Sequence, residues 1–83
     1  MRKQLTLSLE NQVGALERLL RVVRHRGYAV KRFDAHLPDD QSCLQVCMEV
    51  ESDRLAFSLV AQLAKLSEVR SLSMRGEAVS VAH

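Results

Sequence analysis

Polar and hydrophobic residues alternate along the first ten positions of the chain. Leu5, Leu7 and Leu9 are each followed by a polar residue. This period of two is typical of a strand with one buried face. We therefore predict a strand over residues 3–10, with its leucines facing a core.

A helical repeat follows this strand. Its apolar positions fall on one stripe, with charged residues on the other side. The stripe consists of Leu16, Leu19, Leu20 and Val23. Gly27 comes directly after a basic last turn, where a left-handed C-terminal cap forms in many helices. The pattern predicts a helix over residues 14–26.

Two further alternating stretches surround a short turn. The first, residues 28–37, stops at the turn-forming sequence Pro38-Asp39-Asp40-Gln41, and the second covers residues 43–50. A turn this short cannot hold the crossover that parallel strands need, so the two stretches are expected to form an antiparallel hairpin. The apolar positions of the second stretch are Leu44, Val46, Met48 and Val50.

The last third of the chain predicts one more helix and one more strand. The apolar stripe of the helix consists of Leu55, Leu59, Val60, Leu63 and Leu66. With Ser52 or Asp53 as its N-cap, this helix spans residues 53–66. Apolar residues at positions 69, 72 and 74 indicate a short fourth strand. Residues 76–83 are expected to form a tail outside a domain of residues 3–75.

The resulting order is β-α-β-β-α-β, which predicts the α+β class. The expected fold is a ferredoxin-like sandwich, in which two helices cover one face of a four-stranded antiparallel sheet in the order 4-1-3-2. The second strand then lies at an edge, and an unpaired edge invites pairing with another chain. We predict a homodimer through this edge, with Tyr28 and Phe33 near the seam.

Composition narrows the class of function. The 83 residues include 12 Lys and Arg and 10 Asp and Glu, a balance too even for broad binding to a nucleic-acid backbone. No apolar run reaches the length of a membrane span, and no signal peptide is recognisable. Cys43 and Cys47 would lie about 13 Å apart on one strand, too far for a disulfide. We predict a cytoplasmic protein that binds neither nucleic acid nor membrane.

The junction between the first strand and the first helix is a candidate binding site. It reads Asn11-Gln12-Val13-Gly14-Ala15-Leu16. A glycine there allows close approach of a ligand, and the free N–H groups at the start of a helix attract a carboxylate. The same residues also fit an ordinary turn, with Asn11 as the turn or cap residue and Gly14 as the bend.

This junction, followed by Arg26-Gly27-Tyr28, resembles the ACT domain of the acetolactate synthase small regulatory subunits. Those chains typically read Leu-Glu-Asn-x-x-Gly-Ala-Leu and then Arg-Gly-Tyr/Phe-Asn-Ile. Residues 16–27 are similar above all to the short subunits of the isozyme II type. The similarity is strong over residues 9–37 and weaker to about residue 75.

The resemblance implies a noncatalytic subunit that binds and activates the acetolactate synthase catalytic subunit in branched-chain amino-acid synthesis. Thiamine diphosphate, magnesium and FAD would then belong to that partner, with no cofactor in this chain. In valine-sensitive relatives, the effector lies between two ACT domains. The residues that match one half of that site are Asn11, Gly14, Ala15 and Leu16. The other half has Asn in the family and Ala29 here, which predicts weak or absent valine feedback.

Basic residues gather on and after the first predicted helix, namely Arg18, Arg21, Arg24, His25, Arg26, Lys31 and Arg32. They fit a solvated helix face with favourable cations near its C-terminal end. They also fit a docking surface for an acidic patch on the catalytic subunit, with Arg18, Arg21 and Arg24 as the contacts. Both interpretations stay open at this point.

No catalytic residue and no metal site is predicted. If Leu37 lies opposite Ser42 across the hairpin turn, His36 lies opposite Cys43, but a third metal ligand is missing. The glycines are too scattered for a phosphate-binding loop, and no nucleophile has a base that spacing places beside it. Two alternatives remain: an amino-acid-sensing ACT module of another pathway, and a small ferredoxin-like enzyme such as an acylphosphatase.

Overall fold

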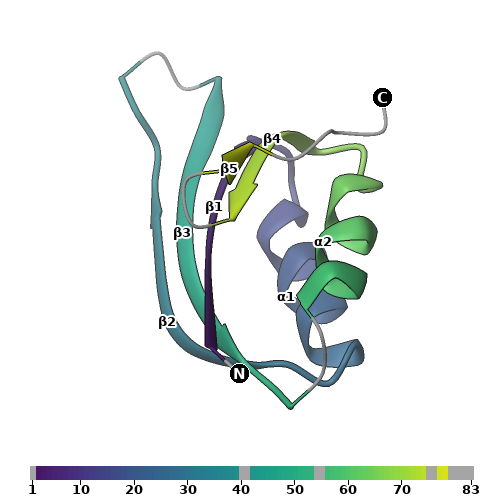
Figure 1. Ribbon diagram of the computed structural model, residues 1–83. Helices are drawn as coiled ribbons and strands as arrows, with labels where there is room; N and C mark the ends of the chain where they lie inside the picture. Colours follow the sequence, from purple (N-terminus) through teal and green to yellow (C-terminus); the bar gives the residue numbers. More distant parts are fainter. Residues whose placement is uncertain (1, 40–41, 54–55, 75–76, 79–83) are drawn as a thin grey trace.

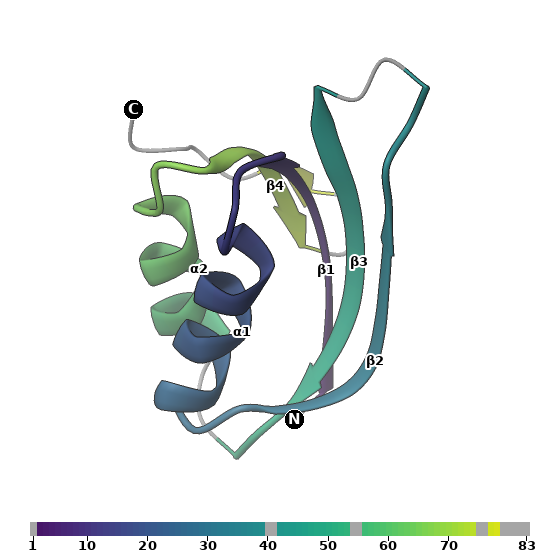
Figure 2. The same ribbon diagram turned by 180° about the vertical axis from the view of Figure 1, so that it is seen from behind.

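The computed structural model describes residues 2–39, 42–53, 56–74 and 77–78. In this part of the chain, two helices lie against one face of an antiparallel sheet, as Figure 1 and, from behind, Figure 2 show. The strands are β1 (Arg2–Glu10), β2 (Ala29–His36), β3 (Cys43–Glu51), β4 (Val69–Met74) and β5 (Glu77–Ala78). The helices are α1 (Ala15–His25) and α2 (Ala56–Ala64). The predicted α+β class and ferredoxin-like arrangement are confirmed.

The strand order across the described sheet is β2-β3-β1-β4-β5, and every neighbouring pair is antiparallel. Without β5, and read from β4 towards β2, this is the expected order 4-1-3-2. The sheet extends one strand further, because Glu77 and Ala78 pair with Met74 and Ser73 of β4. Glu77 and Ala78 belong to the segment 76–83 that we predicted as a tail. The rest of that segment lies outside the described residues.

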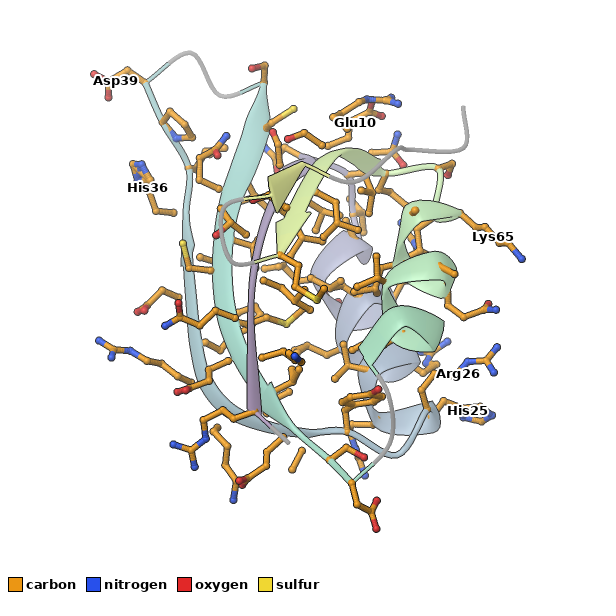
Figure 3. All side chains as sticks on the ribbon, viewed as in Figure 1. Glu10, His25, Arg26, His36, Asp39 and Lys65 are labelled. Carbon is orange, nitrogen blue, oxygen red and sulfur yellow. The ribbon has the colours of Figure 1, made fainter. Side chains whose placement is uncertain are left out.

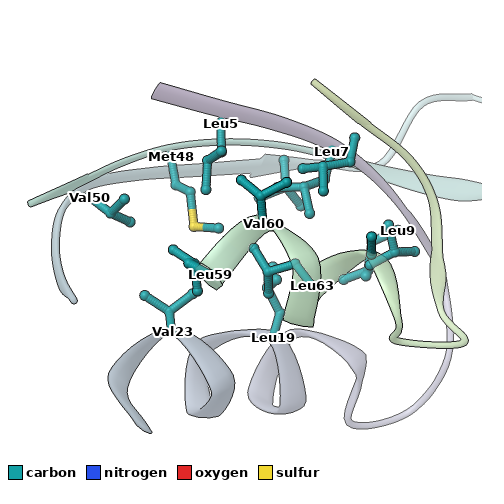
Figure 4. Close-up of a cluster of buried hydrophobic side chains, with 14 of the residues drawn as sticks. Leu5, Leu7, Leu9, Leu19, Val23, Met48, Val50, Leu59, Val60 and Leu63 are labelled. Atoms are coloured by element: carbon teal, nitrogen blue, oxygen red, sulfur yellow. The ribbon is translucent and has the colours of Figure 1, made fainter. Parts of the chain in front are cut away.

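The core lies between the sheet and the two helices. Leu5, Leu7 and Leu9 of β1 all face this layer and are no more than 1% exposed. Around them, Figure 4 labels Leu19, Val23, Met48, Val50, Leu59, Val60 and Leu63. Burial of one such aliphatic side chain contributes about 1.5–3 kcal/mol. The apolar positions of the alternating pattern therefore form the buried face of the sheet.

The C-terminal end of α1 has the predicted glycine cap. Gly27 has a φ of 85°, and its N–H donates to the carbonyl of Arg24 (3.0 Å). The N–H of Tyr28 donates to the carbonyl of Val23 (3.2 Å). This pattern is the Schellman motif, in which the residue after the glycine packs back against the helix. Tyr28 is accordingly only 4% exposed. As a core side chain, Tyr28 has little surface to offer a second chain, and its place near a dimer seam stays a prediction.

The hairpin of β2 and β3 has a different register from the one we assumed. His36 lies opposite Gln45 and not opposite Cys43, a shift of two positions along β3. A β-bulge between Val30 and Arg32 shifts the register a second time. Among the described residues, no three His, Cys, Asp or Glu side chains gather as metal ligands would.

Both helices are shorter than predicted. The expected helix over residues 14–26 is α1, Ala15–His25, and the expected helix over residues 53–66 is α2, Ala56–Ala64. Residues 54–55, at the predicted start of the second helix, lie outside the described residues. In the part of the chain that the structure describes, no helix has the length and apolar character needed to cross a membrane.

Candidate functional site

The β1–α1 loop, residues 11–14, forms a tight turn at one end of the molecule. Gly14 is the N-cap of α1 and has a φ of 80°, a left-handed backbone conformation that strains residues with a side chain. The N–H of Ala15 donates to the carbonyl of Gln12 (3.1 Å), which closes the turn. The side chain of Asn11 is exposed. Of the two roles considered for this junction, the cap therefore belongs to Gly14 and leaves the Asn11 amide open to solvent.

The loop lies beside the hairpin. The N–H of Asn11 donates to the carbonyl of Ser42, just before β3 (3.4 Å). Figure 3 shows Glu10 and the hairpin residue Asp39 at this end of the molecule and His25 at the other end. The loop thus lies at the same end of the molecule as the hairpin, away from the C-terminal end of α1.

The other predicted effector residues do not come together in one chain. Ala15 is 2% exposed and Leu16 packs partly against the core, so both side chains contribute to packing. Ala29 starts β2 opposite Glu51, which in turn pairs with Arg2 at the far end of β1 from the loop. Each chain therefore carries the two predicted halves of the site at opposite ends of the sheet.

Arg18 fastens the β1–α1 loop to the start of β4. Its Nε and Nη2 each lie 2.5 Å from Oε2 of Glu68, and Nη2 also donates to the carbonyl of Val13 (3.1 Å). Glu68 is the one charged residue in the described part that is buried, at 6% exposure, and a buried carboxylate is costly unless it is paired. We predicted Arg18 as a partner contact. The guanidinium is engaged within the chain while 40% of the side chain is exposed, so the contact of Arg18 with the partner stays a prediction.

A second ion pair lies at the same end. The carboxylate of Glu10 binds the guanidinium of Arg70 and also accepts a hydrogen bond from the side-chain amide of Gln12. The N–H of Glu10 donates to the carbonyl of Glu68 (2.6 Å). These contacts join the end of β1 to the start of β4, so both ends of the loop are anchored to the same turn.

The predicted basic cluster divides among different surfaces. A shallow depression on the exposed side of α1 is lined by Glu17, Leu20, Arg21, Arg24 and His25. Lys31 and Arg32 instead lie on β2, where they form ion pairs with Glu51 and Asp34 (3.7 and 3.8 Å). The basic surface that remains open for a partner is therefore the exposed side of α1, which we call the α1 face.

The β2 edge is the other surface that the sequence predicted as an interface. In the described sheet, β2 pairs with β3 on one side and with no strand on the other. Phe33 packs against the core with part of its surface, and His36 points away from the sheet in Figure 3. Cys43 and Cys47 of the neighbouring strand are free thiols.

Comparison with known proteins adds the decisive observation. Residues 11–72 match the model of the ACT domain family. The acetolactate synthase isozyme 2 small subunits of Escherichia coli K12, E. coli O6:H1 and Shigella flexneri are each 34% identical to this chain over 74 residues. The match covers 89% of the chain and 85% of each relative. The chain belongs to the ACT-domain small subunits of acetolactate synthase.

The matched part of this ACT domain includes the whole β1–α1 loop and both members of the Arg18–Glu68 pair. The sequence analysis did not single out Glu68. The available signal was an acidic residue directly before the strand residue Val69. This position indicates a carboxylate near the core, but the sequence does not show which distant cation binds that carboxylate.

Proposed function

We propose that this ACT domain is a noncatalytic regulatory subunit that binds and activates the acetolactate synthase catalytic subunit in branched-chain amino-acid synthesis. The observation that carries the proposal is the 34% identity to isozyme 2 small subunits across 89% of the chain. Thiamine diphosphate, magnesium and FAD belong to the catalytic partner. The small subunit acts by binding more tightly to the competent state of that partner, since only differential affinity shifts a conformational population. The cytoplasm is the compartment we assign to it.

An activity assay tests this proposal directly. The purified chain is mixed with the acetolactate synthase catalytic subunit of the same organism, and acetolactate formation from pyruvate is measured. We expect stimulation that saturates as the chain is added, with no turnover by the chain alone. Turnover by the isolated chain, or a catalytic subunit indifferent to it, would refute the proposal.

We propose that the α1 face docks on an acidic patch of the catalytic subunit. Arg21 and Arg24 lie on this face, and arginine binds carboxylates with planar, multidentate geometry. Reversal of both charges, Arg21→Glu with Arg24→Glu, is expected to weaken binding at least about tenfold, as close interfacial charge pairs do when one partner is reversed. The affinity is measured by titration of the catalytic subunit, and a thermal melt checks that the fold is intact.

A matched control separates docking from a general effect of charge. Lys3→Glu with Lys65→Glu makes the same change in net charge at positions outside both the α1 face and β2. This pair is expected to leave the affinity nearly unchanged at physiological salt, because exposed charges farther apart than about 8 Å are screened. Equal losses from both double variants would remove the α1 face as the docking surface.

Valine feedback through this chain is expected to be weak or absent. Ala29 offers no side-chain hydrogen bond where the family motif has Asn, and the loss of one such partner costs about 1–3 kcal/mol, or roughly a 5- to 150-fold loss of affinity. Ala29 is exposed at the start of β2, so Ala29→Asn fits without disturbing the core. Calorimetric titration is expected to detect tighter valine binding to Ala29→Asn than to the wild type. Micromolar binding by the wild type would contradict this prediction.

We also propose a homodimer through the β2 edge. Antiparallel pairing of two β2 strands places Ala29 of one chain beside the hairpin end of the other, which is the end that carries the β1–α1 loop. This geometry supports an effector site shared between two chains, since neither chain has both halves together. Phe33 lies near the middle of β2 and becomes the apolar contact closest to the seam.

A further inference from the structure

Arg32 and Asp34 place opposite charges on β2, the long edge strand of the described sheet. Their side chains are 77% and 73% exposed. Phe33, which lies between them, packs against the core with part of its surface. Side chains alternate along a strand, so the two charges lie on the face of the sheet that the helices leave uncovered.

Two antiparallel β2 strands related by a twofold axis have few possible registers. Residues directly opposite one another in an antiparallel ladder point to the same face of the sheet. A twofold axis perpendicular to the sheet preserves these faces, so one residue at the axis lies opposite its own copy. At the middle of β2 the candidates for this residue are Arg32, Phe33 and Asp34. Registers centred near either end would leave much of the strand unpaired.

The two charges distinguish these three registers. An axis at Arg32 places two guanidinium groups opposite each other, and an axis at Asp34 does the same with two carboxylates. Like charges in directly opposite positions destabilise a strand pair. An axis at Phe33 instead places each Arg32 opposite the Asp34 of the other copy. The ion pair within each chain (Nε to Oδ2, 3.8 Å) then becomes part of a ring of four alternating charges.

We infer that Arg32 and Asp34 set the register of a homodimer of this chain, with Phe33 at its twofold axis. The inference rests on the dimer through the β2 edge proposed above and adds the feature that selects one alignment of its strands. Exposed ion pairs contribute little affinity by themselves. Their role here is to penalise the neighbouring registers, as charges at interfaces commonly do.

This register completes the candidate effector site from two chains. Ala29 of one copy comes level with Leu37 of the other copy, one residue beyond β2. The hairpin connection that begins there leads to Ser42, whose carbonyl accepts a hydrogen bond from the N–H of Asn11. The register therefore brings Ala29 of one chain to the end of the other chain that carries the β1–α1 loop.

Charge reversal in the full chain tests the inference. Asp34→Arg places arginines opposite one another at both positions, and we expect it to weaken self-association roughly ten- to hundredfold. Arg32→Asp combined with Asp34→Arg exchanges the charges and restores their alternation, so self-association is expected to return to within about threefold of the wild type. Glu17→Arg makes the same change in net charge as Asp34→Arg on the α1 face, away from β2, and is expected to have little effect. Sedimentation measures the association, and thermal melts check the fold.

Cysteine cross-linking identifies the register without reversal of any charge. Both native thiols are first replaced, as Cys43→Ser and Cys47→Ser. Oxidation of a mixture of Arg32→Cys and Asp34→Cys chains is then expected to link one chain of each kind, because directly opposite residues are within reach of a disulfide. Either variant alone is expected to stay unlinked, since its two cysteines would be displaced by two positions and about 7–8 Å apart. The mixed dimer keeps one of the two pairs between Arg32 and Asp34.

The outcomes separate the register from the proposals on which it depends. Linkage of Arg32→Cys alone, or of Asp34→Cys alone, would place the axis at another residue and overturn the inference while the dimer stands. A dimer that Asp34→Arg leaves unaffected would also overturn it. A wild-type chain that sediments only as a monomer would remove the dimer and its register together. The regulatory role is decided separately by the acetolactate assay, which does not depend on the register.

Discussion

Replacement of Leu19 by alanine is expected to lower the free energy of unfolding by about 3 kcal/mol. Leu19 is 0% exposed and belongs to the core between α1 and the sheet. The substitution removes apolar contacts and leaves a cavity that the surrounding strands and helices fill only in part. A domain of this size has a total stability of about 5–15 kcal/mol, so the loss is large enough to leave part of the chain unfolded near body temperature.

The next residue along α1 supplies the control. Leu20 is only partly buried and lines the depression on the α1 face. Leu20→Ala is expected to cost clearly less than Leu19→Ala, because its side chain is partly exposed and does not belong to the buried core cluster. Urea unfolding of both variants measures the difference. Equal costs at the two positions would mean that α1 is rotated from the orientation described.

Removal of the Arg18 guanidinium is expected to destabilise the fold by about 2–3 kcal/mol. Arg18→Met keeps the aliphatic part of the side chain but leaves the Glu68 carboxylate buried without its partner. Breaking a fully buried pair costs about 3–5 kcal/mol. We expect a smaller loss here, because the side chain of Arg18 is 40% exposed and water screens the pair.

A double-mutant cycle identifies the source of this loss. Glu68→Gln removes the buried charge and keeps the shape, so Arg18→Met combined with Glu68→Gln no longer leaves an orphan carboxylate. The double variant is expected to be more stable than Arg18→Met alone, with a coupling of about 1–2 kcal/mol. Additive costs in urea unfolding would show that the two groups do not interact in solution.

Periodicity in the sequence predicted the fold, and the reason lies in the core. The leucines at positions 5, 7 and 9 and the stripe around Leu19 each give one buried face, and the buried faces of a short chain have few ways to meet. The Gly27 cap was also predictable, because a left-handed residue at that position favours glycine. What followed from the cap, the burial of Tyr28, was the step that the sequence analysis left out.

The details of the candidate site were harder to predict because they depend on contacts between distant residues. Arg18 and Glu68 are 50 residues apart in the chain, and before the fold is known any of several arginines could bind that carboxylate. The hairpin register depends on the length of the connection and on a bulge at the edge, and neither leaves a clear pattern in the sequence. The loop residues Asn11 and Gly14 were recognised from local sequence, since a sharp strand-to-helix turn has local requirements.

The two edges of the sheet offer very different lengths of backbone. β2 spans Ala29–His36, whereas β5 at the opposite edge spans Glu77–Ala78 in the described part of the chain. Growth of a fibril by strand addition requires each molecule to have two usable edges. Among the described residues only β2 offers a long edge, and the bulge after Val30 interrupts its regular part. Two chains that pair through β2 both use that edge, so within the described part no second edge of the same length is left for a third chain.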